Sequence, residues 1–333
     1  MTKKTTKIPT IQELYELSVK IGIKNDPREK SIIDKKFKQA KESFEKCKTQ
    51  FEKDCFDQDT LWNPYEDSKM MSVDFKKKVK KIAFGVDIET PELLLIKKLN
   101  DEGANIDLVL AHHPEDKGLL GLGDVMYVQV DVYANEGIPV NIAEKLMNPR
   151  IGEIKEAVHS VNFNRATRAA ELLGLNFGNI HTPCDNCVYT YLKKIFEKKN
   201  DLIVGDIVKE LQKIPEYIEA SKLGNPPSII VGNEKSRAGK IVVTGFTGGT
   251  SGTHKMYEKM AQAGIGTELV MHIPKDHKKQ AEKYGINIIN CGHMASDSLG
   301  INLLLDEFEK LGVEILPLSG FIRYSRNNKK FIK

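Results

Sequence analysis

Long hydrophobic runs are absent from this sequence. No apolar stretch reaches the roughly 20 residues that a membrane-spanning helix needs, and the basic first residues, MTKKTTKIPTIQEL, lack the apolar core of a secretory signal. Cysteine is scarce, and its five copies are spread from Cys47 to Cys291. An odd, scattered set argues against a disulfide framework. We therefore expect a cytoplasmic protein with reduced thiols and no membrane partner.

An excess of one charge is also lacking. The 50 lysines and arginines are interspersed with 46 acids, which leaves a net charge of +4. A dedicated nucleic-acid binder would carry a wide basic stripe, so nucleic acid is the least favoured partner. With 40% apolar and 29% charged residues, the composition is that of an ordinary globular protein. A length of 333 residues predicts two compact units.

The N-terminal part carries two signals for the start of a helix. Thr10 with Glu13, and Asp26-Pro27 with Glu29, both fit capping patterns. The second signal precedes apolar residues at spacings of three and four, which predict one long helix packed against the body or a partner subunit. These residues are Ile33, Phe37, Ala40, Phe44, Cys47 and Phe51. Residues 55–74 are predicted to be a connecting loop.

From Val79 onward, short β-branched or Leu-rich runs alternate with amphipathic helices, which is typical of parallel βαβ units. We predict an α/β fold with largely parallel sheets. A Gly-, Pro- and Asn-rich break at 222–228 divides it. The predicted parts are a helical extension over 1–75, an α/β unit over 76–224 and a second, interlocked α/β unit over 225–333. The predicted strands are 81–87, 106–111, 138–142, 176–180, 228–232, 239–246, 267–273, 286–291 and 313–319.

Two adjacent histidines, His112 and His113, follow the predicted strand 106–111. In open α/β sheets ligands gather beyond the carboxyl ends of the strands. Pro114 holds His113 in extended geometry, so the two side chains point apart. This arrangement suits two neighbouring metal ions, or one ion and an outer contact, better than one shared ion. A pair of ordinary loop histidines is the alternative.

Two other predicted strands also end in potential ligands. After 286–291, His293 and Asp297 stand four residues apart on one helical face, a spacing that lets both reach one ion. After 176–180, the segment HTPCDN brings Asp185. Each acid could also be a simple helix cap. The conjunction of three such strand ends favours one site assembled from distant segments.

The cysteines allow a second interpretation. Cys184 and Cys187 form a C-x-x-C pair that could complete a structural zinc site with Cys291 and His293. The spacing matches no common zinc motif, and buried inert thiols are the alternative.

A glycine-rich segment, TGFTGGTSG at 244–252, joins a predicted strand to a helix that begins near Thr253. Backbone N–H groups at Gly248 and Gly249 could hold a phosphate there. The segment is neither a Walker loop nor a dinucleotide fingerprint, and tight packing explains its glycines equally well.

Residues 79–323 resemble the Nif-three-like proteins, also called type 2 GTP cyclohydrolase homologues. The resemblance rests on the run 82–114 that ends in HHP, on HTPCD and on GHMASDSLGINLL. The N-terminal helices look like those of the longer variant of this family. The resemblance implies a two-part α/β fold, assembly into dimers or ring-shaped hexamers, and a dinuclear metal centre. The ligands that it implies are His112, His113, Asp185, His293 and Asp297.

This sequence departs from the family pattern at two places. The last acid is usually Glu, so the shorter Asp297 could weaken or reposition one ligand. Thr-Pro-Cys replaces the commoner Thr-Asn-Leu before Asp185, which places a thiol beside the implied metal.

Three imidazoles and two carboxylates suit Zn, Mn or Fe better than Mg or Ca, and paired ions can activate water for hydrolysis. We therefore predict a metal-dependent hydrolase of the type 2 GTP cyclohydrolase kind, acting on a nucleotide or other phosphorylated small molecule. A non-catalytic metal-binding adaptor or regulator is the alternative. Predicted supporting residues are His181, Glu115 and His277 for proton transfer or ligand support, and Asn162, Asn164, Arg165, Gly248, Gly249 and His272 for substrate contacts.

Overall fold

The computed structural model describes residues 7–199 and 201–332, so the first six residues of the basic N-terminal segment lie outside it. Its strands are β1 (Lys69–Ser72), β2 (Lys81–Gly85), β3 (Leu108–Ala111), β4 (Phe177–Asn179), β5 (Ser228–Val231), β6 (Lys240–Gly245), β7 (Ile265–Val270), β8 (Asn287–Asn290), β9 (Glu314–Leu318), β10 (Arg323–Ser325) and β11 (Lys330–Ile332).

The helices are α1 (Ile11–Lys24), α2 (Lys30–Glu45), α3 (Gln50–Cys55), α4 (Thr90–Asp101), α5 (Asp116–Leu120), α6 (Leu122–Val125), α7 (Tyr127–Asn135), α8 (Val140–His159), α9 (Arg165–Leu173), α10 (Thr182–Phe196), α11 (Val204–Leu211), α12 (Pro215–Lys222), α13 (Tyr257–Gln262), α14 (Lys275–Tyr284) and α15 (His293–Lys310), with short 3₁₀ turns η1 (Gln58–Leu61) and η2 (His254–Met256). Within the described ranges, no helix is long and apolar enough to cross a membrane.

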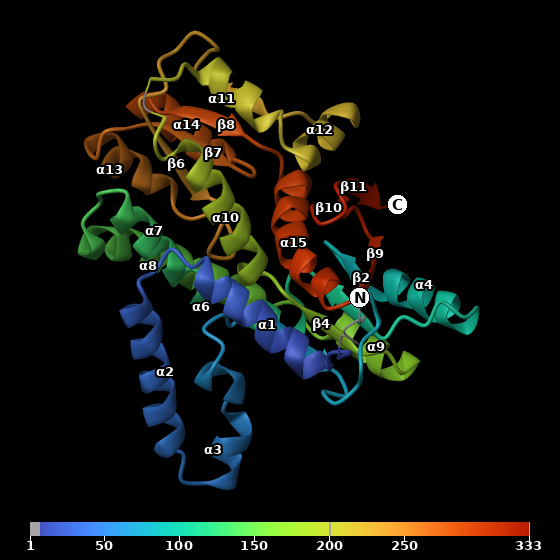
Figure 1. The fold of residues 1–333 in the computed structure, drawn as a ribbon. Coiled ribbons are helices and arrows are strands. Elements are labelled where there is room, and N and C mark those ends of the chain that lie inside the picture. The colour runs from blue at the N-terminus through green and yellow to red at the C-terminus, as the bar shows by residue number, and fades with distance from the viewer. Residues whose placement is uncertain (1–6, 200, 333) are drawn as a thin grey trace.

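Two sheets organise the chain (Figure 1). The first has the order β1-β4-β3-β2-β9 and the second the order β5-β8-β7-β6. The edge strands β1 and β5 are antiparallel to their neighbours, and the other pairings in the two sheets are parallel. The predicted α/β fold with largely parallel sheets is confirmed.

The first sheet is buried on both faces, which explains why its central strands read as continuous apolar runs. On β2, Ile82 and Phe84 pack on the side of α1 and α15, whereas Ala83 packs on the side of α4 and α9. Since helices cover both faces, side chains of a site can gather only beyond the ends of β2 and β3.

Helices α10 and α15 pack against each other between the two sheets (Figure 1). Their apolar residues join the cores of both sheets, as with Val188 and Leu299 on one side and Ile301 on the other. Gly300 makes this close packing feasible, because a Cβ there would lie 2.9 Å from the carbonyl carbon of Cys184. The first turn of α10 is thereby held against α15.

The C-terminal segment returns to the first sheet. β9 pairs in parallel with β2, and the hairpin of β10 and β11 then packs against α15. Ion pairs fix this hairpin: Arg323 pairs with Asp306 and Glu309, and Arg326 pairs with Glu216. The predicted unit 225–333 therefore gives one strand to the first sheet, so a division at residue 224 does not follow the sheets at its C-terminal end.

Two sequence-based predictions of strands and loops were wrong. Residues 138–142, predicted as a strand, contain the start of α8, because Pro139 precedes the helix and Ala143 and Met147 then recur at helical spacing on its buried side. The predicted loop 55–74 contains η1 and β1, and β1 pairs with β4. The short, partly polar run Lys69–Ser72 gives no clear strand signal by itself.

The predicted long helix after residue 29 is also interrupted. α2 ends at Glu45, and Thr49 with Glu52 forms a capping box that starts α3. The two helices project from the body as an arm (Figure 1). Along the apolar stripe Ile33 is buried, and Phe37, Ala40, Phe44 and Cys47 are partly covered. Only Phe51, at 75%, is exposed.

Candidate metal centre

The three predicted motifs meet between the two sheets. His112 and His113 follow β3, and Asp185 lies in the first turn of α10, directly after the neighbouring strand β4. His293 and Asp297 lie in the first turns of α15, which follows β8 of the second sheet. The convergence of these segments follows from the close contact between α10 and α15.

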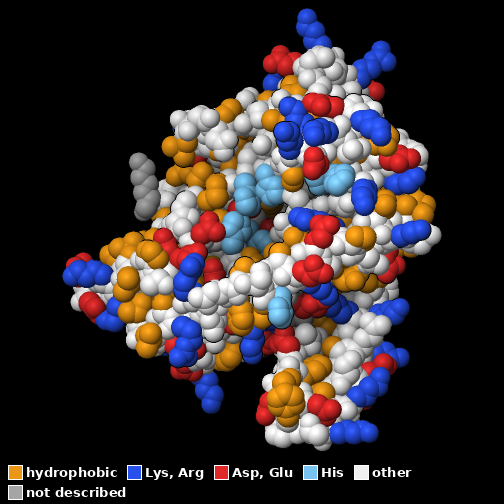
Figure 2. All heavy atoms as spheres, turned by 180° about the vertical axis from the view of Figure 1, so that it is seen from behind, with side chains coloured by type: hydrophobic (Ala, Val, Ile, Leu, Met, Phe, Trp, Pro, Cys, Tyr) orange, Lys and Arg blue, Asp and Glu red, His pale blue; other side chains and the backbone are white. Residues whose placement is uncertain are grey.

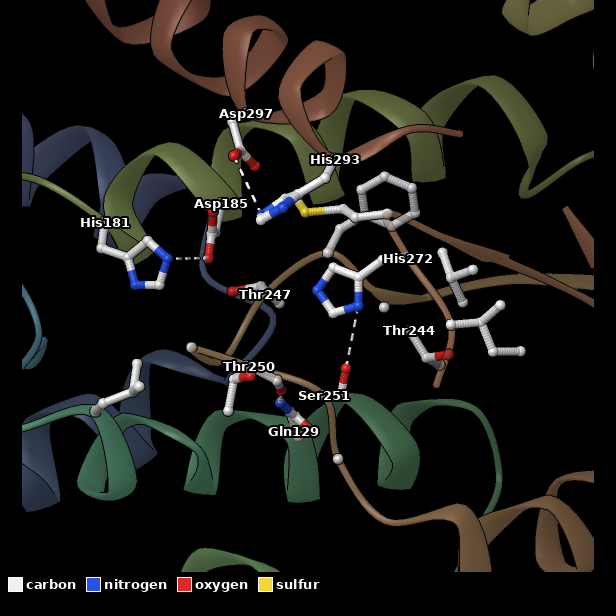
Figure 3. A pocket seen from close by; sticks show the side chains of 18 of the residues that line it. Gln129, His181, Asp185, Thr244, Thr247, Thr250, Ser251, His272, His293 and Asp297 are labelled. Atoms are coloured by element: carbon white, nitrogen blue, oxygen red, sulfur yellow. Dashed lines mark hydrogen bonds and ion pairs between the residues drawn. The ribbon is translucent and has the colours of Figure 1, made fainter. Parts of the chain in front are cut away.

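Figure 3 shows how the helix-borne side chains face one another. His181 and Asp185 project from the start of α10, and His293 and Asp297 project from the start of α15. His272 lies close to His293 in this view.

The first potential ligand group consists of His112, Asp185 and Asp297, all buried. The Nε2 atom of His112 lies 3.4 Å from Oδ1 of Asp185 and 3.7 Å from Oδ1 of Asp297. Two donors that bind one ion at about 2.1 Å lie roughly 3.0–3.4 Å apart. These three donors are therefore close to the spacing that a single ion requires.

The second group consists of His113, His293 and the same Asp297. Here Oδ2 of Asp297 lies 3.3 Å from Nε2 of His293 and 3.5 Å from Nε2 of His113. The two oxygens of this carboxylate thus face different groups. The shorter aspartate side chain reaches both of them from its position in α15.

Three donor atoms of these groups are left without a partner. Nε2 of His112 and both carboxylate oxygens of Asp297 are buried and form no hydrogen bond with any described residue. Buried polar atoms are nearly always satisfied, because an unpaired one costs free energy. Divalent cations held by the two groups would satisfy these atoms, so the buried His and Asp groups fit metal binding.

Outer contacts orient the imidazoles toward this centre. Nδ1 of His112 donates to the carbonyl oxygen of Ile180 at 3.2 Å, and Nδ1 of His113 donates to Asp87 at 2.6 Å. Both contacts leave the Nε2 atoms free to face the donors on α10 and α15. Such contacts are typical of metal-binding histidines and fix the tautomer.

His181 lies beside the two groups. It forms a third potential ligand cluster with His112 and His113, and its Nε2 atom is 3.7 Å from Oδ2 of Asp185. Its Nδ1 atom donates to Oδ2 of Asp67 at 2.8 Å, and Asp67 also accepts a bond from Thr182. His181 can therefore act as a ligand or as a support for Asp185.

Sequence reasoning missed Asp87 and Asp67. Asp87 follows β2, next to the strand that carries the paired histidines, and that adjacency was an available signal. Asp67 precedes β1 within the predicted loop 55–74. It reaches His181 only because β1 pairs with β4, which no local pattern encodes.

Charges within the cluster stabilise one another. Burial alone would raise the pKa of Asp297, but His112 and His113 together lower it far below its usual value. Burial likewise opposes the charged form of His113, yet Asp297 and Asp87 raise its pKa to about 9. The centre thus favours positive charge beside buried carboxylates.

A cavity of about 400 Å³ opens beside the cluster. Figure 2 shows histidine side chains gathered in a hollow on the face opposite to that of Figure 1. Residues of the second sheet, of the segments that follow β2 and β3, of α7 and of the glycine-rich loop line it. The cavity is large enough for a small-molecule ligand.

Several predicted supporting residues line this cavity, namely His181, Glu115, His277, Gly249 and His272. Burial, with Glu89 nearby, raises the pKa of Glu115 to about 7. Burial, with His254 nearby, lowers the pKa of His277 to about 4. The ring centroid of His272 lies 5.0 Å from that of His293.

Other predicted substrate contacts lie elsewhere. Asn162, Asn164 and Arg165 do not line the cavity. Asn164 precedes α9, and Arg165 forms an exposed ion pair with Glu89. Gly248 is also absent from the wall, because its carbonyl is turned toward Gln129 and accepts a hydrogen bond at 2.7 Å. The expectation that these four residues contact a phosphate does not hold for this cavity.

The alternative zinc site is not formed either. Among the described residues, no potential ligand cluster includes a cysteine. Cys184 and Cys187 are buried in α10, and Cys187 faces Asn25 of the N-terminal part at 3.7 Å. Burial raises the pKa of both thiols, which favours the inert, protonated form.

Comparison with known proteins supports a family assignment. No protein-family model and no curated protein matches the chain. Among solved structures, a NIF3 superfamily protein from Sphaerobacter thermophilus matches with a TM-score of 0.69 and 27% identity, over 77% of this chain and 91% of that chain.

Two other solved structures match less closely. Reduced HcgD from Methanocaldococcus jannaschii has a TM-score of 0.45 and 14% identity, over 75% of this chain and 87% of its own. A protein from Thermus thermophilus has a TM-score of 0.44 and 14% identity, over 77% of this chain and 90% of its own. The assignment rests on the Sphaerobacter protein, whose fold and sequence match most of this chain. The fold of this chain is that of the NIF3 superfamily protein from Sphaerobacter thermophilus, which supports a Nif3-like family assignment.

Proposed function

We propose that this chain is a metal-dependent hydrolase that acts on a nucleotide or another phosphorylated small molecule. The observation that carries the proposal is the shared position of Asp297, whose two oxygens face two separate ligand groups at the wall of one cavity. Each group offers three donors. We therefore propose two divalent ions, with Zn, Mn or Fe as the candidates that imidazole and carboxylate donors suit.

Ions bound there would supply an activated water molecule and positive charge against developing negative charge. Side chains of this protein determine where the ions and the activated water would lie. Asp297 turns one carboxylate oxygen toward each ligand group. Asp87 and the Ile180 carbonyl restrict the rotation of the paired imidazoles. Such restriction favours reaction because the donors need no rearrangement when substrate arrives.

The glycine-rich loop supports a phosphorylated substrate. Gln129 fixes this loop by donating to the carbonyl oxygens of Gly248 and Thr250, at 2.7 and 2.5 Å. The backbone N–H groups of Gly249 and Ser251 donate to no described residue, so they are available to an anion. His277 lines the same cavity, and its pKa, lowered to about 4 by burial and by His254, keeps it neutral at pH 7, so its ring can exchange hydrogen bonds with a substrate.

Metal analysis and a hydrolysis screen of the purified full chain test the proposal. We expect two divalent ions per chain and turnover of at least one member of a nucleotide and sugar-phosphate panel. Asp297→Asn should reduce metal content and abolish turnover. The matched control is His159→Gln, which changes an exposed histidine of α8 and should alter neither.

Two outcomes would overturn the proposal in different ways. Bound metal without turnover across the panel would favour the non-catalytic adaptor or regulator. Absence of metal after purification and after reconstitution would remove both functions, because each depends on the same donors.

We further propose that the chain forms a dimer or a hexamer and works in the cytoplasm, as the family resemblance implies. The arm of α2 and α3 projects from the body and offers the uncovered side chain of Phe51 as a contact for assembly. Sedimentation of the full chain at micromolar concentration tests this. A monomer under these conditions would contradict it.

A further inference from the structure

A buried carboxylate lies in the wall of the same cavity, within the second sheet. Glu268 belongs to β7, between β6 and β8, and only 4% of its surface is exposed. Its neighbours on this face of the sheet are apolar, including Val242, Val270 and Ile288. Glu268 is therefore a charged side chain at a position where packing alone would favour a hydrocarbon.

Only neutral groups of the chain satisfy this carboxylate. The hydroxyl of Thr244 donates to Oε1, and the hydroxyl of Tyr257 donates to Oε2 at 2.8 Å. No lysine, arginine or histidine of the described residues forms an ion pair with it. Each oxygen has further acceptor capacity once it has accepted one hydrogen bond. The site thus has two adjacent acceptor positions and no internal cation.

The surrounding wall has the features of a binding surface rather than of a sealed core. Glu268, Thr244 and Tyr257 all line the cavity. Tyr133 lines it as well and is 6% exposed, yet its hydroxyl has no hydrogen-bond partner among the described side chains and backbone groups. Burial raises the pKa of Glu268, so a ligand that supplies hydrogen-bond donors would relieve the cost of its charge.

We propose that Glu268 is the anchor of a recognition subsite that binds a planar ligand group carrying two adjacent N–H donors. Two parallel N–H groups match the two oxygens of a carboxylate, as in bidentate pairs of arginine with acids. Two sources present this chemistry: the N–H edge of a 2-amino-6-oxopurine base, and an amidine or guanidine group. The identification of the cavity as a substrate site rests on the proposed function.

Calorimetric titration of the chelator-treated full chain tests the subsite without the metal centre. Guanosine and benzamidine are the probes for the two sources. Inosine lacks the amino group of guanosine, and benzyl alcohol lacks the paired N–H groups of benzamidine. We expect at least one probe to bind, and to bind at least about tenfold more tightly than its partner compound.

Glu268→Gln keeps the size of the side chain and its capacity to accept from Tyr257. It replaces one acceptor oxygen with a donor, so it should weaken binding of the preferred probe by at least about tenfold. Glu258→Gln, on α13 and outside the cavity wall, is the control and should leave binding unchanged.

Equal binding of guanosine and inosine together with equal binding of benzamidine and benzyl alcohol would overturn the inference, as would full binding by Glu268→Gln. Failure here is distinguishable from failure of the proposed function. Turnover that requires metal but ignores Glu268 would remove only the subsite. Probe binding that requires Glu268 in a chain that holds no metal would remove only the hydrolase.

Discussion

Gly300 lies where α15 packs on α10, and its replacement by alanine should push apart the two helices that carry Asp297 and Asp185. The added Cβ would lie 2.9 Å from the carbonyl carbon of Cys184, closer still to its oxygen, and 3.5 Å from Cγ1 of Val188. Real Cβ atoms essentially never approach within 3.0 Å of such atoms. A backbone carbonyl in a helix cannot rotate away, so the helices themselves must move.

The magnitude follows from two opposing terms. Overpacking a well-filled interior costs about 1–3 kcal/mol, and we expect the upper end because the obstacle is backbone. Replacing glycine by alanine within a helix returns about 1 kcal/mol of the free energy of unfolding. The net loss for Gly300→Ala should therefore be about 2 kcal/mol.

Gly152→Ala is a matched control, since Gly152 lies within α8 and no atom lies within 4 Å of an added Cβ. It should gain up to about 1 kcal/mol, so the two variants should differ by about 3 kcal/mol. Urea unfolding measures both, and a chelator competition measures metal affinity, which should fall only in Gly300→Ala. Equal stability of the two variants would refute the claim that this contact sets the spacing of the helices.

Three further outcomes are expected. Arg326→Ala should lower the free energy of unfolding by about 3 kcal/mol, measured in urea, because it removes a bidentate partner at 2.8 and 2.9 Å from the fully buried Glu216. Asp67→Asn should weaken metal affinity at least about tenfold in a chelator competition, since Asp67 orients His181. His277 has a pKa lowered from 6.5 to about 4 by burial and by a neighbouring histidine; the unfolded chain therefore takes up its proton first as pH falls. The free energy of unfolding should thus fall between pH 6.5 and 4, and less steeply in His277→Gln.

The central strands and the paired histidines could be predicted from sequence. β2 and β3 are covered on both faces, so they appear as uninterrupted apolar runs. His112 and His113 follow directly at the end where ligands collect in such sheets. The start of α1 could be predicted as well, because the capping box of Thr10 and Glu13 is a local signal.

The remaining features depend on contacts between distant segments. β1 is short and partly polar, and it becomes a strand only by pairing with β4. The bond from His181 to Asp67 therefore had no local signature. Which ligand group each oxygen of Asp297 faces depends on the separation of α10 and α15. That separation is set by tertiary packing at Gly300, and a pattern of hydrophobic spacing contains no information about it.

The return of β9 to the first sheet has a consequence for synthesis of the chain. β2 and β3 emerge from the ribosome early, but β2 lacks its outer neighbour until the final residues have been made. The paired histidines are likewise exposed on the nascent chain before Asp297 has been translated. The full set of donors of the proposed metal centre is therefore available only after nearly the whole polypeptide has been made, and an ion captured earlier by the histidines would meet an incomplete set of donors.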